Sequence, residues 1–134
     1  MAFFFIHYAR LFYQAVAKTA VPSLITGKFV QLRNGPNDYL VFSPKEFTKY
    51  HAHIIERFCM DNGLEGKFDV KGERYSITDT AWKIMGGGKY EIDSVQKTLR
   101  LYDDSMAYGK FRKAGLAKSI NSLPEYSDFR IMVE

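Results

Sequence analysis

The sequence predicts a domain of the α+β (mixed α/β) class, with one mainly six-stranded sheet flanked by two helices and an extra N-terminal amphipathic helix. Three observations lead to this prediction. Short runs of apolar and β-branched residues, bounded by Gly, Pro, Asn or Asp, recur along the chain and are typical of strands. Two longer internal runs have the three-to-four-residue periodicity of helices. Apolar residues make up 46% of the 134 residues and aromatic residues 16%, which is enough for one core.

The N-terminal residues 2–20 have the pattern of a helix. Their polar side chains recur every three or four residues and form one narrow stripe: His7, Arg10, Gln14 and Lys18. Large apolar side chains cover most of the remaining circumference. The apolar run is shorter than the ~20 residues that cross a bilayer, and no basic residue precedes it as in a secretory signal. We therefore expect residues 1–22 to form an amphipathic anchoring helix, separate from a domain of residues 23–134.

Two positions suit such a helix. It either packs on the core of its own domain or docks outside it, through residues 3–18, on subunits of a larger complex or on a membrane surface. Burying an aromatic side chain is worth about 2 kcal/mol, so exposing several together favours association. Residues 27–133 already contain the elements of a complete domain, and we therefore predict docking outside it.

The next elements are a strand pair and a helix. Residues 28–33 and 38–42 have strand patterns, and Asn34-Gly35-Pro36-Asn37 between them is typical of a turn. In Ser43-Pro44-Lys45-Glu46, serine suits the N-cap, proline the first helical position and glutamate the capping box. The predicted helix starts there and ends at Gly63.

The second half of the chain begins with strand patterns. These cover residues 67–70, 75–77, 81–85, 89–92 and 98–102, the last two joined by a turn. A helical pattern follows from Tyr108 to Ser122, Pro124 closes it, and residues 129–133 form a terminal strand pattern.

Charge and cysteine content narrow the function classes. The net charge of +4 comes from residues 1–37, which contain no acidic residue, while the remainder is neutral, so a nucleic-acid partner is not expected. The acid-free N-terminus suits a mitochondrial or cytoplasmic protein rather than a secreted one. Cys59 is the only cysteine, which excludes an intrachain disulfide. No Cys/His cluster has zinc spacing, and neither a metal nor a cofactor is expected.

The segment from Tyr102 to Gly109 is a candidate anion site, because it joins a predicted strand to a predicted helix. The first amides of a helix have no intrahelical acceptor, and the helix dipole favours a negative charge there. His51 is the candidate base. Its side chain and that of His53 point roughly 200° apart on a helix, with His51 on the inward side, so the two cannot share one site.

Three motifs occur in a fixed order: Tyr50-His51-Ala52, Gly86-Gly87-Gly88-Lys89 and Ser105-Met106-Ala107-Tyr108-Gly109. With them, the chain resembles the Janus/Ocnus family, which includes small phosphohistidine phosphatases, over about residues 27–133. The resemblance implies that His51 is catalytic. The residues that it implies for phosphate binding are Lys28, Tyr50, Ala52, Lys89, Ser105, Met106 and Ala107, of which the last three use backbone amides.

The resemblance also implies a reaction. The family hydrolyses phosphohistidine or phospholysine on proteins without a metal ion, with the histidine as base or as nucleophile. The family usually has a glycine shortly before the loop serine, where this chain has Asp103-Asp104. Two carboxylates there would repel a phosphate, so we expect both to point out of the pocket. The alternative function is a non-catalytic accessory subunit of a larger, mitochondrial assembly that uses the same fold as a scaffold.

Overall fold

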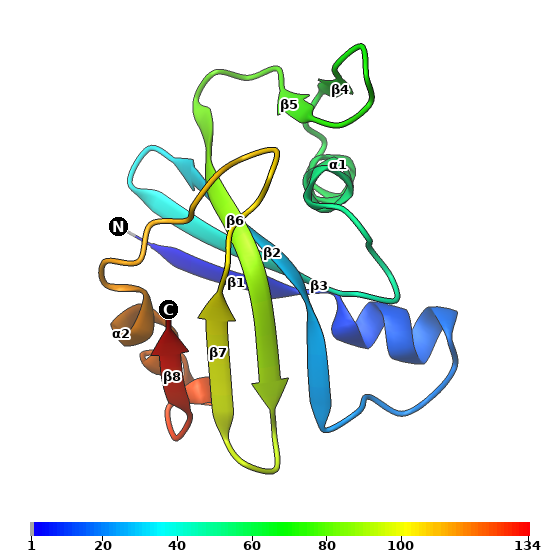
Figure 1. The fold of residues 1–134 in the computed structure, drawn as a ribbon. Helices are drawn as coiled ribbons and strands as arrows, with labels where there is room; N and C mark the ends of the chain where they lie inside the picture. Colours follow the sequence, from blue (N-terminus) through cyan, green and yellow to red (C-terminus); the bar gives the residue numbers. More distant parts are fainter. Residues whose placement is uncertain (1) are drawn as a thin grey trace.

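The computed structural model describes residues 2–134 and confirms the mixed α+β class (Figure 1). A six-stranded sheet has the strand order β1-β3-β2-β6-β7-β8. Its strands are β1 (Phe3–His7), β2 (Leu24–Asn34), β3 (Asn37–Pro44), β6 (Trp82–Asp93), β7 (Thr98–Tyr102) and β8 (Arg130–Val133). The helices are the π-helix η1 (Leu11–Val16), α1 (His51–Asp61), α2 (Leu116–Asn121) and the 3-10 helix η2 (Pro124–Tyr126). A small hairpin of β4 (Gly66–Phe68) and β5 (Tyr75–Ile77) lies beside α1.

The sheet separates two apolar cores, because alternate residues of each strand point to opposite faces. On one face, α2 and η2 cover a cluster that includes Phe29, Phe42 and Tyr90. On the other face, α1 covers a cluster that includes Val30 and Val41. Figure 1 shows α1 and α2 on opposite sides of the central strands. Each core aromatic side chain contributes about 2 kcal/mol by burial, so both helices are fixed to the sheet.

The predicted N-terminal helix over residues 2–20 is wrong. Residues Phe3–His7 form β1, an edge strand parallel to β3, and the helical part is limited to residues 9–16, of which Leu11–Val16 form the π-helix. Successive side chains of β1 pack on opposite faces: Phe5 contacts the ring of Phe42 at a centroid distance of 4.4 Å, whereas Phe4 stacks on Tyr39 at 4.7 Å. A run of aromatic residues satisfies this alternation as well as a helical stripe, and pairing with β3 decides between them. The segment therefore packs on residues 27–133 rather than docking outside them.

Both other predicted helices begin later than expected. β3 continues to Pro44, which pairs with Gly27, and α1 starts only at His51. The Ser43 hydroxyl does not cap a helix but forms a buried 2.6 Å hydrogen bond with the Thr48 hydroxyl. The last helix covers Leu116–Asn121 instead of residues 108–122. Gly115 precedes it with φ +76°, a left-handed conformation, so the helix cannot extend toward the N-terminus beyond this residue.

His7 makes the N-terminal strand sensitive to pH. Its Nε2 atom forms a 2.9 Å hydrogen bond with the Tyr90 hydroxyl, and the aromatic rings of Phe5 and Phe42 lie beside it. Burial lowers the pKa of His7 from its ordinary 6.5 to about 4. The folded protein therefore resists protonation of this ring, whereas the unfolded chain does not.

We expect the free energy of unfolding to fall by about 1–3 kcal/mol as the pH is lowered from about 6.5 to about 4. Within that window the unfolded chain binds a proton at His7 and the folded chain does not, so acid favours unfolding. Denaturant titrations at several pH values measure the decline. His7→Gln, which does not titrate and retains a partner for Tyr90, should show a shallower decline. An equally steep decline in this variant would assign the effect to other groups.

Candidate functional site

The N-terminus of α1 is the first component of the site. Tyr50 is its N-cap, with extended backbone and no side-chain cap hydrogen bond. The amides of His51 and Ala52 donate no hydrogen bond to any of residues 2–134, whereas the amide of His53 donates to Tyr50 O at 3.1 Å. Two backbone donors at the positive end of the helix dipole therefore have no acceptor among the described residues, the arrangement that binds anions at other helix N-termini. The sequence placed the anion-binding helix start at Tyr108, where the structure has no helix.

His51 is held against the sheet by its ring. Its Nε2 atom lies 2.9 Å from Gly88 O on β6, and the residue is only 7% exposed. A carbonyl oxygen only accepts, so the proton is on Nε2 and the Nδ1 atom carries the lone pair. No side chain or backbone group of residues 2–134 is hydrogen-bonded to Nδ1. The hydrogen bond thus fixes the tautomer and leaves one basic nitrogen unused.

The charge state of His51 suits a base. Burial lowers the pKa of the imidazole, and the nearby Lys28 and Lys89 lower it further, while the hydrogen bond to Gly88 and the carboxylate of Asp103 act in the opposite direction. Together these effects lower the pKa of His51 from its ordinary value of 6.5. The ring is therefore neutral at physiological pH, the form in which Nδ1 can accept a proton or attack an electrophile.

The glycines of β6 allow the histidine ring to lie on the strand. A β-carbon on Gly87 would be 2.9 Å from His51 Cδ2 and 2.8 Å from Phe29 O, and one on Gly88 would be 2.6 Å from Tyr102 O. Real β-carbons do not make contacts this short, so each position excludes a side chain. The triple-glycine motif thus has a structural reason in this chain: it makes room for His51 and for the backbone of the neighbouring strands.

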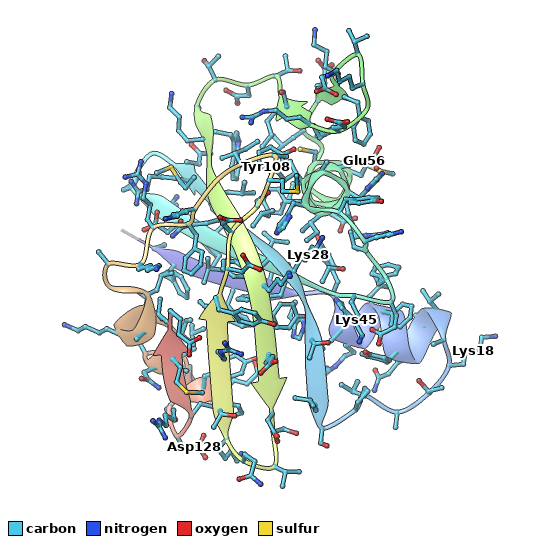
Figure 2. The ribbon with its side chains drawn as sticks, in the orientation of Figure 1. Lys18, Lys28, Lys45, Glu56, Tyr108 and Asp128 are labelled. Atoms are coloured by element: carbon cyan, nitrogen blue, oxygen red, sulfur yellow. The ribbon has the colours of Figure 1, made fainter. Side chains whose placement is uncertain are left out.

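Two lysines lie beside the histidine. Lys28 on β2 and Lys89 on β6 are direct partners in the antiparallel register, so their side chains project from the same face. Lys28 Nζ is 5.6 Å from the centre of the Tyr50 ring, which places this ammonium near the start of α1. Figure 2 shows Lys28 between the sheet and α1. The structure therefore brings together His51, Tyr50, Ala52, Lys28 and Lys89.

These lysines line an open cleft of about 320 Å³. Its walls are Thr26, Gly27, Lys28, Lys45, Thr48, Lys49, Lys89 and Tyr102. Two of the four lysines, Lys45 and Lys49, were not candidates from the sequence. They lie in the stretch that the capping-box pattern assigned to the first turns of a helix, and the helix starts only after them.

The loop of Ser105, Met106 and Ala107 follows β7 on the α1 side of the sheet. Ser105 N donates to Gly109 O at 3.2 Å, and the Ser105 hydroxyl accepts from Tyr108 N at 3.1 Å. Gly87 N also donates to Gly109 O, which ties the loop to the β6 residue beneath the His51 ring. The amides of Met106 and Ala107 donate to no group among residues 2–134. Two of the three predicted loop amides are therefore free.

Asp103 departs from the expected arrangement, because its carboxylate does not point away from the lysines. Asp103 Oδ2 lies 3.1 Å from Lys89 Nζ, and its Oδ1 accepts from the Asp104 amide at 2.9 Å. These contacts lower the pKa of Asp103, with the Lys89 hydrogen bond as the largest cause. Its φ of +65° is in the left-handed region, where Asp is tolerated and Gly is favoured. Asp103 does not itself line the cleft, but its carboxylate pairs with Lys89, one of the four lysines that do.

The described residues also set limits on other site types. Residues 2–134 contain no group of three or more His, Cys, Asp or Glu side chains placed to hold a metal ion. In the same part of the chain, no helix is long and apolar enough to cross a membrane.

Comparisons with known proteins match nearly the whole chain. The model of the Janus/Ocnus family (Ocnus) matches residues 24–130. The sex-regulated protein janus-B of Drosophila teissieri and that of Drosophila yakuba are each 28% identical to the chain over 124 residues. The janus-B protein of Drosophila melanogaster is 27% identical over 124 residues. Each alignment covers 91% of this chain and 88% of the relative.

Proposed function

Because this chain belongs to the Janus/Ocnus family, we propose that its cleft binds a phosphoryl group carried on a protein histidine or lysine and hydrolyses the P–N bond without a metal ion. The observation that carries the proposal is the state of His51. A buried, neutral imidazole has its tautomer fixed by Gly88 O and leaves Nδ1 unused, next to two lysines and a helix N-terminus. A histidine that only supports the fold does not require two lysines beside it.

Binding of the phosphoryl group follows from the free donors. Lys28 lines the cleft, and the amides of His51, Ala52, Met106 and Ala107 have no acceptor among residues 2–134. In the proposed complex, this ammonium and these amides neutralise the negative oxygens of the phosphoryl group. Such pre-positioned donors stabilise charge on the transferring phosphoryl group more effectively than water does. Lys89 becomes a further donor to the phosphoryl group when its ion pair with Asp103 opens.

The chemistry assigns Nδ1 of His51 one of two roles. As a base, it takes a proton from a water molecule whose oxygen attacks phosphorus. The P–N bond breaks with its electron pair on nitrogen, and the leaving nitrogen receives a proton. As a nucleophile, Nδ1 attacks phosphorus itself, and the substrate P–N bond breaks with its electron pair on the leaving nitrogen, which takes a proton from solvent. Water then attacks the phosphoryl group on Nδ1, which releases inorganic phosphate and restores the imidazole. Both roles need the neutral Nε2–H tautomer that Gly88 O selects.

The test is phosphate release from a histidine-phosphorylated protein at neutral pH in the presence of EDTA. We expect multiple turnovers with the chelator present. We also expect Asp103→Gly to raise kcat/KM by about 3–10-fold, because it removes a surface carboxylate, frees Lys89 and relieves a left-handed residue. Asp69→Gly, a change of the same type in the loop between β4 and β5, should not raise it.

Three results would contradict the proposal in whole or in part. Phosphate release no faster than without the protein would exclude the hydrolytic function. Binding of the phosphorylated protein without release would instead identify a phosphoryl-binding protein, and the accessory-subunit alternative would then gain support. An unchanged kcat/KM in Asp103→Gly would show that the Asp103–Lys89 pair lies outside the phosphoryl site.

A further inference from the structure

We propose that Lys45 and Lys49 form a second anion subsite in the cleft, which selects protein substrates with acidic residues beside the phosphorylated side chain. The inference rests on the proposed function, because the phosphoryl group positions the substrate in the cleft. Both lysines line the same cleft as Lys28 and Lys89, and both come from the connection between β3 and α1.

The charge of the cleft exceeds what one phosphoryl group neutralises. Among residues 2–134, no carboxylate lies within ion-pair distance of Lys28, Lys45 or Lys49, and only Lys89 is paired, with Asp103. Three positive charges therefore remain, besides the positive end of α1. A phosphoryl dianion balances two of them. The remaining charge fits a carboxylate from a neighbouring residue of the substrate.

The backbone that carries these lysines is held in place. Lys45 N donates to Thr26 O at 3.0 Å, which fastens it to β2. A β-carbon on Gly27 would lie 3.0 Å from Lys45 N and still closer to Ser43 O, so the missing side chain permits this approach. The buried hydrogen bond between Ser43 and Thr48 closes the next turn. A positioned donor loses less freedom on binding than a mobile one.

Glu46, the acidic residue of the same connection, is hydrogen-bonded to the N-terminal π-helix. The Tyr13 hydroxyl donates to Glu46 Oε2 at 3.1 Å. The neighbouring Phe47 ring lies 5.2 Å from the Phe12 ring and 3.9 Å from the guanidinium carbon of Arg57. The N-terminal π-helix thus binds Glu46 and leaves the two lysines facing the cleft. In Figure 2, Lys45 lies on the side of Lys28 that is nearer to this helix.

A polypeptide fits the surface better than a small molecule. A second groove of about 380 Å³ runs from the cleft along α1, sharing Thr48 and Lys49 with it. Its far end is lined by Glu56, Arg57 and Met60, so the unpaired positive charge lies at the end that Lys49 shares with the cleft. Lys49 Nζ lies 5.5 Å from the Tyr50 ring that also contacts Lys28, so it stands between the phosphoryl site and the groove. Residues next to the phosphorylated side chain would pass over it.

The experiment compares two phosphohistidine peptides of equal length, one with Asp and Glu around the phosphohistidine and one with Gly and Ala. We expect wild-type protein to favour the acidic peptide by about 3–10-fold in kcat/KM. Lys45→Ala/Lys49→Ala should bring the ratio close to one. The control Lys71→Ala/Lys118→Ala removes the same charge from exposed positions elsewhere and should retain the preference. Raised salt should weaken the preference in wild type.

A binding arm separates this inference from the proposed function. Fluorescence anisotropy measures the affinity for the same two peptides carrying a non-hydrolysable phosphohistidine mimic. If no peptide is hydrolysed but wild type still binds the acidic peptide more tightly, and Lys45→Ala/Lys49→Ala does not, the subsite stands without the activity. Equal affinity of wild type for both peptides, or equal effects of the two double variants, would overturn the inference.

Discussion

His51→Ala is expected to lower kcat for phosphohistidine hydrolysis by about 10²–10⁴-fold, the range that a positioned acid–base or nucleophilic group contributes. The variant removes the basic ring nitrogen whose tautomer is fixed by Gly88 O and whose pKa is affected by Lys28. Initial rates of phosphate release under saturating substrate measure the effect. His53→Ala is the control, because His53 lies on the same helix with an exposed side chain. Equal losses in the two variants would contradict the assignment.

Two further comparisons separate chemistry from structure at this position. His51→Gln retains an N–H group for Gly88 O but has no basic nitrogen, so it should be as inactive as His51→Ala while unfolding at a similar denaturant concentration to wild type. The direction in which activity changes with pH can also be predicted. Since the neutral ring is active and its pKa is lowered, activity should persist at pH 7 and decline only as the pH falls below about 6.5.

Gly87→Ala is expected to lower kcat/KM by about 100-fold, the loss that a misplacement of about 1 Å produces. The new β-carbon would collide with Phe29 O and with the His51 ring, at 2.8 and 2.9 Å. The backbone of the paired strand yields less readily than a side chain, so the ring must move from Gly88 O. Overpacking of this kind also destabilises by about 1–3 kcal/mol. Kinetic assays and denaturant unfolding of the same preparation measure both effects.

The matched control is Gly72→Ala. Gly72 has φ +72°, and a β-carbon at this position would have no other atom within 4 Å, so the substitution strains the backbone without touching the site. It should cost about 1 kcal/mol of stability and leave kcat/KM unchanged. Full activity in Gly87→Ala would show that the position of the His51 ring does not matter for the reaction.

Local patterns predicted the parts of the fold that depend on local chemistry. The β2–β3 hairpin followed from alternation on either side of an Asn-Gly-Pro-Asn turn, and β7 from its own alternation. The N-terminal segment was mispredicted because its pairing partner, β3, lies more than 30 residues away. A run such as Phe3–His7 suits either a buried strand or an apolar helix, and only the distant partner selects one.

The site shows the same division. Helical periodicity placed His51 inward and His53 outward, and the structure confirms that His51 is buried and His53 exposed. The hydrogen bond from His51 to Gly88 depends on where β6 passes beneath α1, and helical periodicity gives no information about that tertiary contact. The positions of Lys45 and Lys49 in the cleft could not be predicted, because β3 extends to Pro44 and α1 begins only at His51. Residues 3–18 pack on their own domain, and contact of this segment with a partner stays a prediction, for which Phe4, Leu11 and Val16 are the exposed large apolar residues among those described.

The most direct measurement of the central claim follows the P–N bond itself. A histidine-phosphorylated peptide is mixed with wild-type or His51→Gln protein in EDTA at neutral pH, and phosphorus NMR records the phosphohistidine and inorganic phosphate signals over time. Wild type should convert the first signal into the second much faster than the peptide converts alone, and His51→Gln should match the peptide alone. Equal rates with wild type, with His51→Gln and without protein would contradict the account.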